Sequence, residues 1–255
     1  MEPASANKGY FGRFMVEGIE FGGLIVGGKV YETCCDGLGP VHNLGDLTWL
    51  PPSEPSKIVC IGLNNAGHAK DVGRPVPKEP LLFLKAGSAL AAHEEPVIYP
   101  SITKVVGSEA ELVIVIGKTA ENVSEEEALD YVLGYTCGND LAARDIQHGD
   151  GQWMRGKSLP GFAPIGPAIR LGSDIDPYNL RIVMRLNGRV CQDYNTKDLV
   201  FGVRELISYT SRMMPLYPGD VIMTGTAGGS PAVNVGDVME VEIEGIGVLR
   251  NKVAE

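Results

Sequence analysis

Residues 109–118 have the sequence Glu-Ala-Glu-Leu-Val-Ile-Val-Ile-Gly-Lys, and residues 111–118 of this stretch form the strongest predicted strand of the chain. Successive side chains of a strand point to opposite faces of the sheet. Beyond Glu111, both faces of this segment carry only apolar side chains as far as Ile116. A strand that is apolar on both faces is predicted to be buried inside the fold.

The segment that follows this strand is predicted to be a helix that leads back into the sheet. Ser124 begins a Ser-x-x-Glu capping box with Glu127, and acidic residues lie in the first turn, where the helix dipole favours them. The helix is expected to extend to about Leu133 and to end at Gly134. Residues 135–137 then return as a strand.

The remaining chain is rich in short strands and turns. Apolar runs predict buried strands at residues 57–63 and 81–85, and Asn187-Gly188 is a typical two-residue hairpin turn. A second helix is expected over 203–213, and residues 146–164 are expected to form a long glycine-rich loop. The class is therefore α+β and strand-dominated, and the missing β-α alternation argues against a Rossmann sheet or a (β/α)8 barrel.

A proline-rich stretch divides the chain into two predicted parts. Residues 51–56 have the sequence PPSEPS, which is stiff, extended and typical of a boundary. We therefore expect a small N-terminal β module over 1–52 and a main domain over 53–255.

Composition limits the possible partners and the compartment. The 255 residues carry a net charge of −10, which argues against nucleic-acid binding and against anionic membranes. No apolar run is long enough for a membrane helix, and residues 1–12 lack the apolar block of a signal peptide. The five cysteines include no Cys-x-x-Cys pair, which is typical of reduced thiols in a cytoplasmic protein.

Two glutamates lie at the entrance of the strand predicted over 111–118. Glu109 and Glu111 are two residues apart, so both side chains point to one face. Two unpaired carboxylates in a poorly solvated place would cost several kcal/mol or become protonated. A divalent cation removes this cost, and oxygen-only ligands favour Mg²⁺, Mn²⁺ or Ca²⁺ over zinc. The alternative is a frayed strand end in water, with Lys104 as an ion-pair partner.

A third carboxylate, Asp140, follows the predicted strand over 135–137. If that strand neighbours the one that carries Glu111, Asp140 reaches the same point. Three carboxylates and waters would suit an octahedral Mg²⁺ site that is open to substrate. The alternative is that Asp140 only caps a turn, where aspartate is common for local hydrogen-bonding reasons.

Three further residues are candidates for catalysis or binding. His68 follows a buried strand and is a candidate general base, with Asp71 as the carboxylate that would orient it. Lys157, in a Gly-Lys-Ser loop, is a candidate for stabilising an oxyanion. Thr226 belongs to a Thr-Gly-Thr segment that is suited to hold a carboxylate. Each of the three is also compatible with an ordinary surface or loop position.

The ordered set of these segments resembles the fumarylacetoacetate hydrolase family. The resemblance extends from about residue 55 to residue 250, and all of its pieces occur together in the right order and spacing. The matching segments are KIVCIGLNNAGH (57–68), EPLLFLK (79–85), EAELVIVIGK (109–118), ND (139–140), ARDIQ (143–147), GKS (156–158) and TGT (224–226).

The resemblance implies a mixed β-roll or β-sandwich fold, with a small N-terminal β module, in a homodimer. It implies that Glu109, Glu111 and Asp140 hold Mg²⁺ or Mn²⁺ and that His68 is the base. It also implies that Lys157 and three further residues hold waters of the metal or oxygens of the substrate; these three are Arg144, Gln147 and Thr226. The implied substrates are small oxo acids, with no nucleic acid and no membrane as partner.

The activity expected first is hydrolysis of a C–C bond in a 2,4-dioxo acid, in which His68, oriented by Asp71, deprotonates water. The alternative is an isomerase, keto–enol tautomerase or decarboxylase that uses the same metal site. Asp71 fits this alternative, because many family hydrolases have the longer Glu there. Asn65 and Ala227 also depart from the family pattern, which often has Tyr and Pro at these places. A more remote alternative is a dicarboxylate-binding protein without catalysis.

Overall fold

The structure is a computed structural model that describes residues 9–34, 37–172 and 174–255. Cys35, one of the thiols considered above, lies outside these residues. The strands are β1 (Gly9–Val16), β2 (Ile19–Val26), β3 (Lys29–Cys34), β4 (Gly37–Asn43), β5 (Thr48–Leu50), β6 (Ile58–Gly62), β7 (Leu81–Lys85), β8 (Leu90–Ala91), β9 (Val97–Ile98), β10 (Val106–Gly107), β11 (Ala110–Ile116), β12 (Val132–Asn139), β13 (Ala142–Ala143), β14 (Ala163–Leu171), β15 (Arg181–Leu186), β16 (Arg189–Asn195), β17 (Val221–Met223), β18 (Ala232–Val233), β19 (Val238–Ile243) and β20 (Gly247–Ala254). The helices are α1 (Ala66–Asp71), α2 (Arg144–Gly149), α3 (Met154–Lys157) and α4 (Val203–Met213), with 3₁₀ turns η1 (Leu44–Asp46), η2 (Gly87–Ala89), η3 (Ala128–Tyr131) and η4 (Thr196–Asp198).

Strand β11 lies inside the largest sheet, whose order is β4-β3-β2-β1-β14-β12-β11-β17-β6-β7. It pairs antiparallel with β12 on one side and with β17 on the other. All seven of its residues are buried, which confirms the prediction from its two apolar faces. The strand-dominated α+β class is likewise confirmed.

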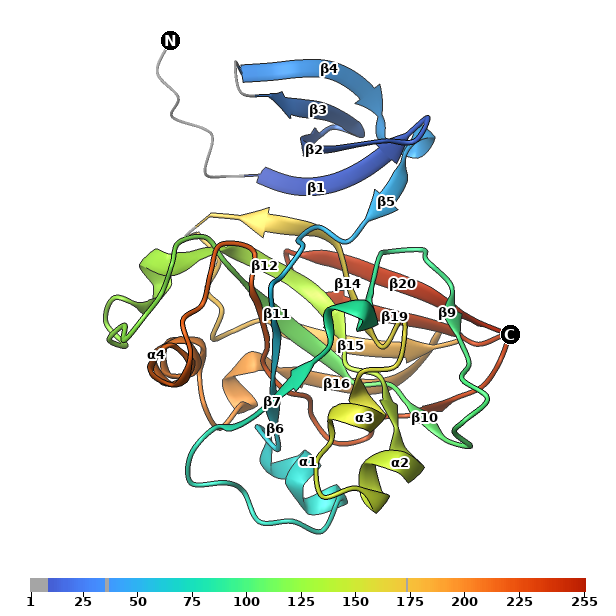
Figure 1. Cartoon of the computed structure of the whole chain (residues 1–255), viewed down its shortest axis with the longest axis vertical. Helices are drawn as coiled ribbons and strands as arrows, with labels where there is room; N and C mark the ends of the chain where they lie inside the picture. Colours follow the sequence, from blue (N-terminus) through green and yellow to red (C-terminus); the bar gives the residue numbers. More distant parts are fainter. Residues whose placement is uncertain (1–8, 35–36, 173) are drawn as a thin grey trace.

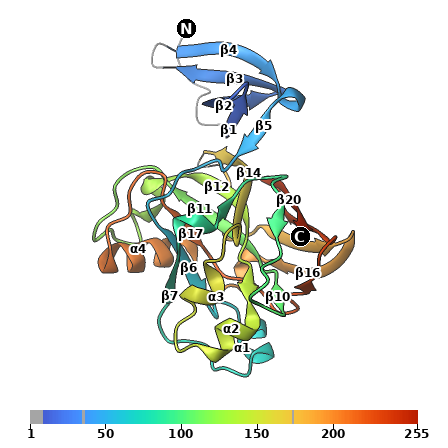
Figure 2. The ribbon, with the colours of Figure 1, turned by 45° about the vertical axis from the view of Figure 1, so that its right-hand side comes forward.

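The first five strands lie at one end of the molecule (Figures 1 and 2). They have a small core of their own, in which Phe14, Val30 and Leu47 are buried. Strand β1 also pairs with β14, where Phe11 lies opposite Ile169, so these strands are continuous with the rest of the large sheet. The domain boundary after residue 52 stays a prediction.

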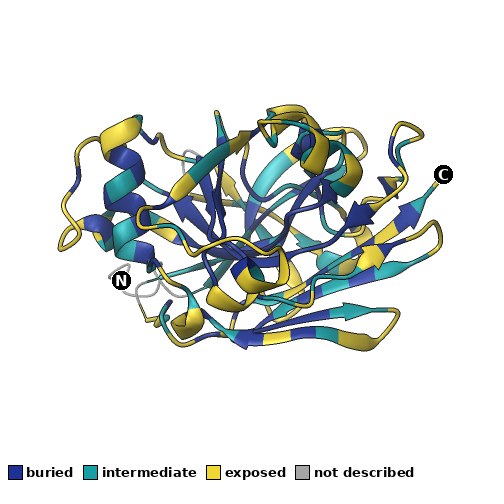
Figure 3. Cartoon of the chain, turned by 90° about the horizontal axis from the view of Figure 1, so that it is seen from below, coloured by how far each residue is buried: buried dark blue, intermediate teal, exposed yellow. Residues whose placement is uncertain are grey.

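A second sheet, in the order β16-β15-β19-β20-β9, completes the core. Its β15–β16 hairpin turns at Asn187-Gly188, and both residues have positive φ, as the predicted two-residue turn requires. Helix α4 spans the predicted range of 203–213 and buries six of its eleven residues, while the others are partly buried or, at its C-terminal end, exposed (Figure 3). Among the described residues, no helix is both long and apolar enough to cross a membrane.

Two local predictions were wrong. The helix expected from Ser124 to Leu133 is only the 3₁₀ turn η3, although the Ser124 hydroxyl does accept the Glu127 N–H at 3.3 Å. Val132 already pairs with Ile116 of β11, so strand pairing takes the residues that the helix needed. The expected loop over 146–164 contains α3 and most of α2. With α1 and α4, the described chain has four α-helices, whereas two were expected.

Candidate active site

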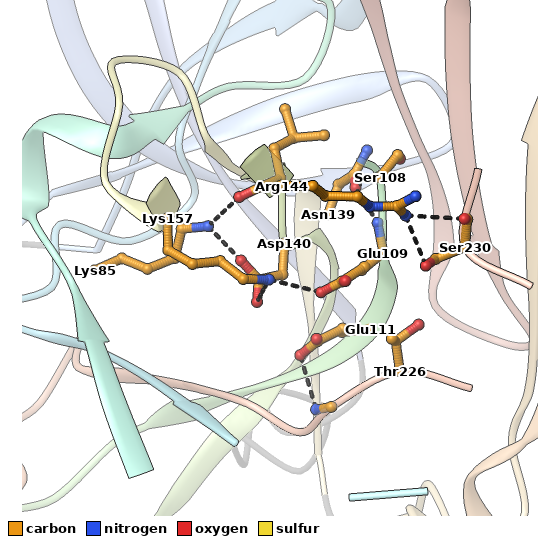
Figure 4. A network of polar contacts seen from close by, with 12 residues as sticks. Lys85, Ser108, Glu109, Glu111, Asn139, Asp140, Arg144, Lys157, Thr226 and Ser230 are labelled. Carbon is orange, nitrogen blue, oxygen red and sulfur yellow. Dashed lines mark hydrogen bonds and ion pairs between the residues drawn. The ribbon is translucent and has the colours of Figure 1, made fainter. Parts of the chain in front are cut away.

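The three predicted carboxylates meet where β11 begins and β12 ends. Ala110 of β11 pairs with Asn139 of β12. Glu109 and Glu111 are the chain neighbours of Ala110, and Asp140 is the chain neighbour of Asn139, so all three carboxylates lie near this pair. One oxygen from each carboxylate lies within 4.8 Å of the others, and all three side chains are buried (Figure 4). Antiparallel pairing thus brings together residues about thirty positions apart.

The backbone around this cluster is fixed by Asn139. Its side-chain oxygen accepts hydrogen bonds from the Ser108 hydroxyl at 2.9 Å and from the Glu109 N–H at 3.0 Å. The Asp140 N–H donates to the Glu109 carbonyl at 2.8 Å. The two carboxylate-bearing segments are therefore tied together before any ligand binds.

Two buried lysines face the carboxylates. Lys157 Nζ, at the end of α3, donates to Glu109 Oε2 at 2.7 Å and to Asp140 Oδ2 at 2.8 Å. Lys85 Nζ, at the end of β7, donates to Asp140 Oδ1 and to the Leu141 carbonyl, the latter at 2.9 Å (Figure 4). The sequence analysis assigned no role to Lys85, because a lysine that ends an apolar strand usually reaches solvent.

Together, burial and neighbouring charges raise the pKa values of Glu111 and Lys157 and lower that of Asp140. Burial, and then the charges of Asp140 and Glu109, raise the pKa of Glu111 well above its usual value, against one hydrogen bond from the Gly225 N–H at 2.8 Å. Burial also acts to raise the pKa of Asp140, but Lys157 and Lys85 outweigh it and lower that pKa. Burial acts to lower the pKa of Lys157, and the two carboxylates it contacts raise it.

The chemistry of the cluster fits a hard divalent cation. Its donors are carboxylate oxygens, the ligands that Mg²⁺ and Mn²⁺ prefer. If all three carboxylates are ionised, they and the two lysines leave one formal negative charge. Among the described residues, Glu111 has no side-chain cation as hydrogen-bond partner, so its ionised form is the one that lacks compensation. A cation beside Glu111 would remove the cost that raises its pKa.

A cavity of about 120 Å³ opens onto the cluster and contains most of the predicted site. His68 of α1 and Gln147 of α2 lie on its wall, and Thr226 follows β17 at its base. The predicted residues that line it are Glu109, Glu111, Asp140, His68, Gln147, Lys157 and Thr226.

The expected pairing of His68 with Asp71 is not formed, which corrects the prediction. Asp71 Oδ2 instead accepts the Gly229 N–H at 3.0 Å, and its carboxylate fills the space that a Cβ on Gly228 would need. Within the described part of the chain, the His68 imidazole makes no hydrogen bond with Asp71. Helix α1 has only six residues, so the loop at 228–229 determines where the Asp71 side chain points.

Arg144 lies beside the cavity rather than on its wall. Its Nη2 donates to the Ser230 carbonyl at 2.9 Å and to the Ser230 hydroxyl at 2.8 Å (Figure 4). It borders an adjoining cavity of about 230 Å³, which His68, Asp71 and Glu109 also line. The structure thus places the nine predicted residues in two neighbouring cavities that share His68, Glu109 and Gln147.

Gln192 was missed by the sequence analysis and positions Thr226. Its Nε2 donates to Thr226 Oγ1 at 2.9 Å and to the Ala227 carbonyl at 2.8 Å, and its Oε1 accepts the Ala110 N–H at 3.1 Å. Gln192 lies 34 residues before Thr226, in the hairpin strand β16, most of whose residues are not buried. The only sequence signal was a polar residue at an inward-facing position of β16.

Comparison with known proteins identifies the family that the sequence resembles. Residues 57–254 match the family model described as "Fumarylacetoacetate (FAA) hydrolase C-terminal". A mitochondrial oxaloacetate tautomerase of Bos taurus is 41% identical over 225 residues, which cover 84% of this chain and 72% of the relative.

Two solved structures have the same fold. The 2-hydroxyhepta-2,4-diene-1,7-dioate isomerase from Mycobacterium marinum is 35% identical with a TM-score of 0.89, covering 96% of this chain and 98% of its own. The fumarylpyruvate hydrolase from Pseudomonas aeruginosa in complex with Mn²⁺ and pyruvate is 33% identical with a TM-score of 0.74, covering 80% and 91%. The predicted fold type is therefore confirmed beyond its class.

Proposed function

Because the chain belongs to the fumarylacetoacetate hydrolase family, we propose that it is a divalent-metal-dependent keto–enol tautomerase of a small 2-oxo acid. The observation that carries this choice is that His68 is not paired with Asp71. His68 lines the cavity with the carboxylate cluster, but the carboxylate that would make it a strong base for water is turned toward Gly229. Tautomerisation needs no activated water. The similarity to an oxaloacetate tautomerase supports the same choice.

The cofactor in this proposal is Mg²⁺ or Mn²⁺, held by Glu109, Glu111 and Asp140. Such an ion supplies a Lewis acid that stabilises an enolate oxygen. The donor set and the surplus negative charge described above support this assignment. The Mn²⁺ in the hydrolase from Pseudomonas aeruginosa supports it as well.

Three side chains would act on the substrate itself. Lys157 keeps its positive charge, because its pKa is raised, and would stabilise the negative charge that develops on the enolate. Thr226 Oγ1 accepts a hydrogen bond from Gln192, and its O–H group would donate to a substrate oxygen. His68 would take a proton from C3 of the keto form, and the oxygen of the resulting enolate would take a proton from water to give the enol. In the reverse direction the enol oxygen would lose its proton to water and His68 would return a proton to C3.

C–C bond hydrolysis, the activity first expected from the sequence, is the second candidate. His68 and Asp71 line one cavity beside Glu109, so a rotation of the Asp71 side chain is the change that their pairing requires. The similarity to a fumarylpyruvate hydrolase supports this candidate. Decarboxylation on the same site is a third outcome of the test.

Product analysis by NMR distinguishes these activities. Purified protein with Mn²⁺ would be mixed separately with oxaloacetate and with acetylpyruvate, with EDTA and protein-free Mn²⁺ as controls. The proposal predicts faster exchange of the C3 protons with solvent and no new carbon products. Acetate and pyruvate from acetylpyruvate would establish the hydrolase, and pyruvate with CO₂ from oxaloacetate would establish a decarboxylase.

A further inference from the structure

The cavity has a second cation, the guanidinium of Arg74, which the roles given so far do not use. Arg74 lines the cavity together with Glu109 and Lys157. It also lines a neighbouring hollow of about 640 Å³ that Leu81–Leu84 and residues 150–154 border. Arg74 therefore lies where the carboxylate-lined cavity meets the outer hollow.

The end of helix α1 fixes the backbone of Arg74. Gly73 has φ +66°, its N–H donates to the Lys70 carbonyl at 3.1 Å, and the Arg74 N–H donates to the Ala69 carbonyl at 2.9 Å. These two bonds form a Schellman motif. Arg74 is thus held on the same short unit as His68.

The ring of Trp153 lies beside the Arg74 guanidinium, and Phe83 packs behind that ring. Arg74 Cζ lies 5.8 Å from the centroid of Trp153, and Trp153 packs edge-on against Phe83 at 5.3 Å. Lys157 Nζ lies 5.6 Å from the centroid of Phe83. The Trp153–Phe83 pair therefore contacts two cations, Lys157 at the carboxylate cluster and Arg74 at the outer hollow.

A glycine makes room for this arrangement. A Cβ on Gly62 would lie 2.4 Å from Trp153 Cζ3, so a larger residue at the end of β6 would displace the ring. Trp153, Phe83 and Arg74 line both cavities. The three side chains form a continuous wall from the outer hollow to Lys157.

Within the described residues, the Arg74 guanidinium makes no ion pair. Asp150, which lines the same hollow, is bound by Arg155 through both oxygens, at 2.8 Å and 2.5 Å. The chain as a whole carries a net charge of −10, which repels dianions. A cation without a protein partner at the mouth of a small cavity is suited to attract a second negative group on the ligand.

We propose that Arg74 binds the distal carboxylate of a short 2-oxo dicarboxylic acid whose 2-oxo acid end faces Glu109, Glu111 and Asp140. Arg74 is then a specificity-determining residue that selects dicarboxylates over acids of equal length with an uncharged tail. This inference rests on the proposed function for the orientation of the substrate. It adds the chemical class of the tail, which the carboxylate cluster does not specify.

Calorimetry with two stable hydroxy acids tests this selection without turnover. L-malate and 2-hydroxybutanoate have four carbons each and differ only in the distal carboxylate. Each would be titrated into the Mn²⁺-loaded protein. Wild type is expected to bind malate roughly tenfold or more tightly than 2-hydroxybutanoate, the discrimination expected of one charge-assisted hydrogen bond. Arg74→Gln should abolish this preference, and Arg74→Lys should keep part of it.

Lys70→Gln is the matched control, because Lys70 is an exposed cation on α1 that lines none of the cavities. It removes the same charge and should keep the preference for malate. An unchanged preference in Arg74→Gln, or a wild type that does not prefer malate, would overturn the inference. If wild type prefers malate but does not tautomerise oxaloacetate, the proposed function fails and the role of Arg74 stands.

Discussion

Lys85 and Lys157 bind different oxygens of the same carboxylate, that of Asp140. Lys157 Nζ donates to Oδ2 at 2.8 Å, and Lys85 Nζ donates to Oδ1. Both lysines are buried, and Lys157 also contacts Glu109. Asp140 is therefore held in its ionised form and fixed in place, whereas Glu111 has only the Gly225 N–H as donor, and burial and the neighbouring carboxylates raise its pKa.

Replacing Lys85 by methionine should destabilise the metal-free protein and strengthen metal binding. Loss of one partner of a buried ion pair costs about 3–5 kcal/mol. The same change makes the cluster more negative, so Mn²⁺ should raise the midpoint of thermal unfolding more than in wild type. Thermal unfolding with and without Mn²⁺ measures both effects. A metal-free Lys85→Met protein as stable as wild type would show that the pair does not hold Asp140.

Glu111→Gln should have the opposite pair of effects. It removes the carboxylate whose pKa burial and its neighbours raise, while the amide oxygen can still accept the Gly225 N–H. The metal-free variant should unfold about 2–4 °C higher, the shift that ~1 kcal/mol causes in a protein of this size. Its affinity for Mn²⁺ should fall by about tenfold or more. Calorimetric titration that gives the wild-type affinity would remove Glu111 from the ligand set.

The separation of His68 from Asp71 predicts different effects of their variants. Asp71→Asn keeps an oxygen for the Gly229 N–H and should retain most of the tautomerase activity. His68→Ala removes the proposed proton acceptor and should lower kcat roughly 100-fold or more. Steady-state kinetics on oxaloacetate measures both. Equal losses in the two variants would indicate that they act as a pair, and would favour the hydrolase.

Asp220, far from the cluster in sequence, predicts how stability depends on pH. It is buried and accepts hydrogen bonds from the Ser56 hydroxyl at 2.7 Å, from the Lys57 N–H at 3.1 Å and from the Tyr217 N–H at 2.8 Å. Burial acts to raise its pKa, but Lys57 and these donors lower it. A carboxyl whose pKa is lower in the folded state stabilises the fold above its unfolded pKa of about 3.9, and this stabilisation is lost as the pH falls further.

Asp220→Asn should therefore lower the free energy of unfolding at pH 7, by about 1–3 kcal/mol. It should also reduce the loss of stability between pH 5 and pH 3 relative to wild type. Urea unfolding over this pH range measures both quantities. Parallel pH profiles for the two proteins would show that Asp220 does not contribute to the acid sensitivity.

The parts of the fold that the sequence predicted correctly are those that local patterns determine. The apolar faces of 110–116, the Asn187-Gly188 turn and helix α4 depend on residues that are close in sequence. The helix expected from Ser124 failed because a long-range constraint, the pairing of Val132 with Ile116, overrides a favourable cap.

The candidate site also contains residues that local patterns could predict and residues that they could not. Two glutamates at a strand entrance and an aspartate at a strand exit meet because β11 and β12 pair directly, so the sequence could predict their convergence. Lys85 is 55 residues from Asp140, and Gln192 is 34 residues from Thr226. Contacts of this kind depend on how separate strands pack. Lys85 has no local signal that distinguishes it from a surface residue, and Gln192 has only its inward-facing position in β16.

The central claim is that the cluster of Glu109, Glu111 and Asp140 makes the chain a metal-dependent tautomerase. The most direct measurement is the decay of the ultraviolet absorbance of enol-oxaloacetate with Mn²⁺, compared between wild type, Glu111→Gln and Mn²⁺ without protein. The account predicts that wild type accelerates the decay well above the protein-free rate, that EDTA removes the acceleration, and that Glu111→Gln needs more Mn²⁺ to restore it. A wild-type rate equal to that of Mn²⁺ alone, or one that EDTA does not change, would contradict it.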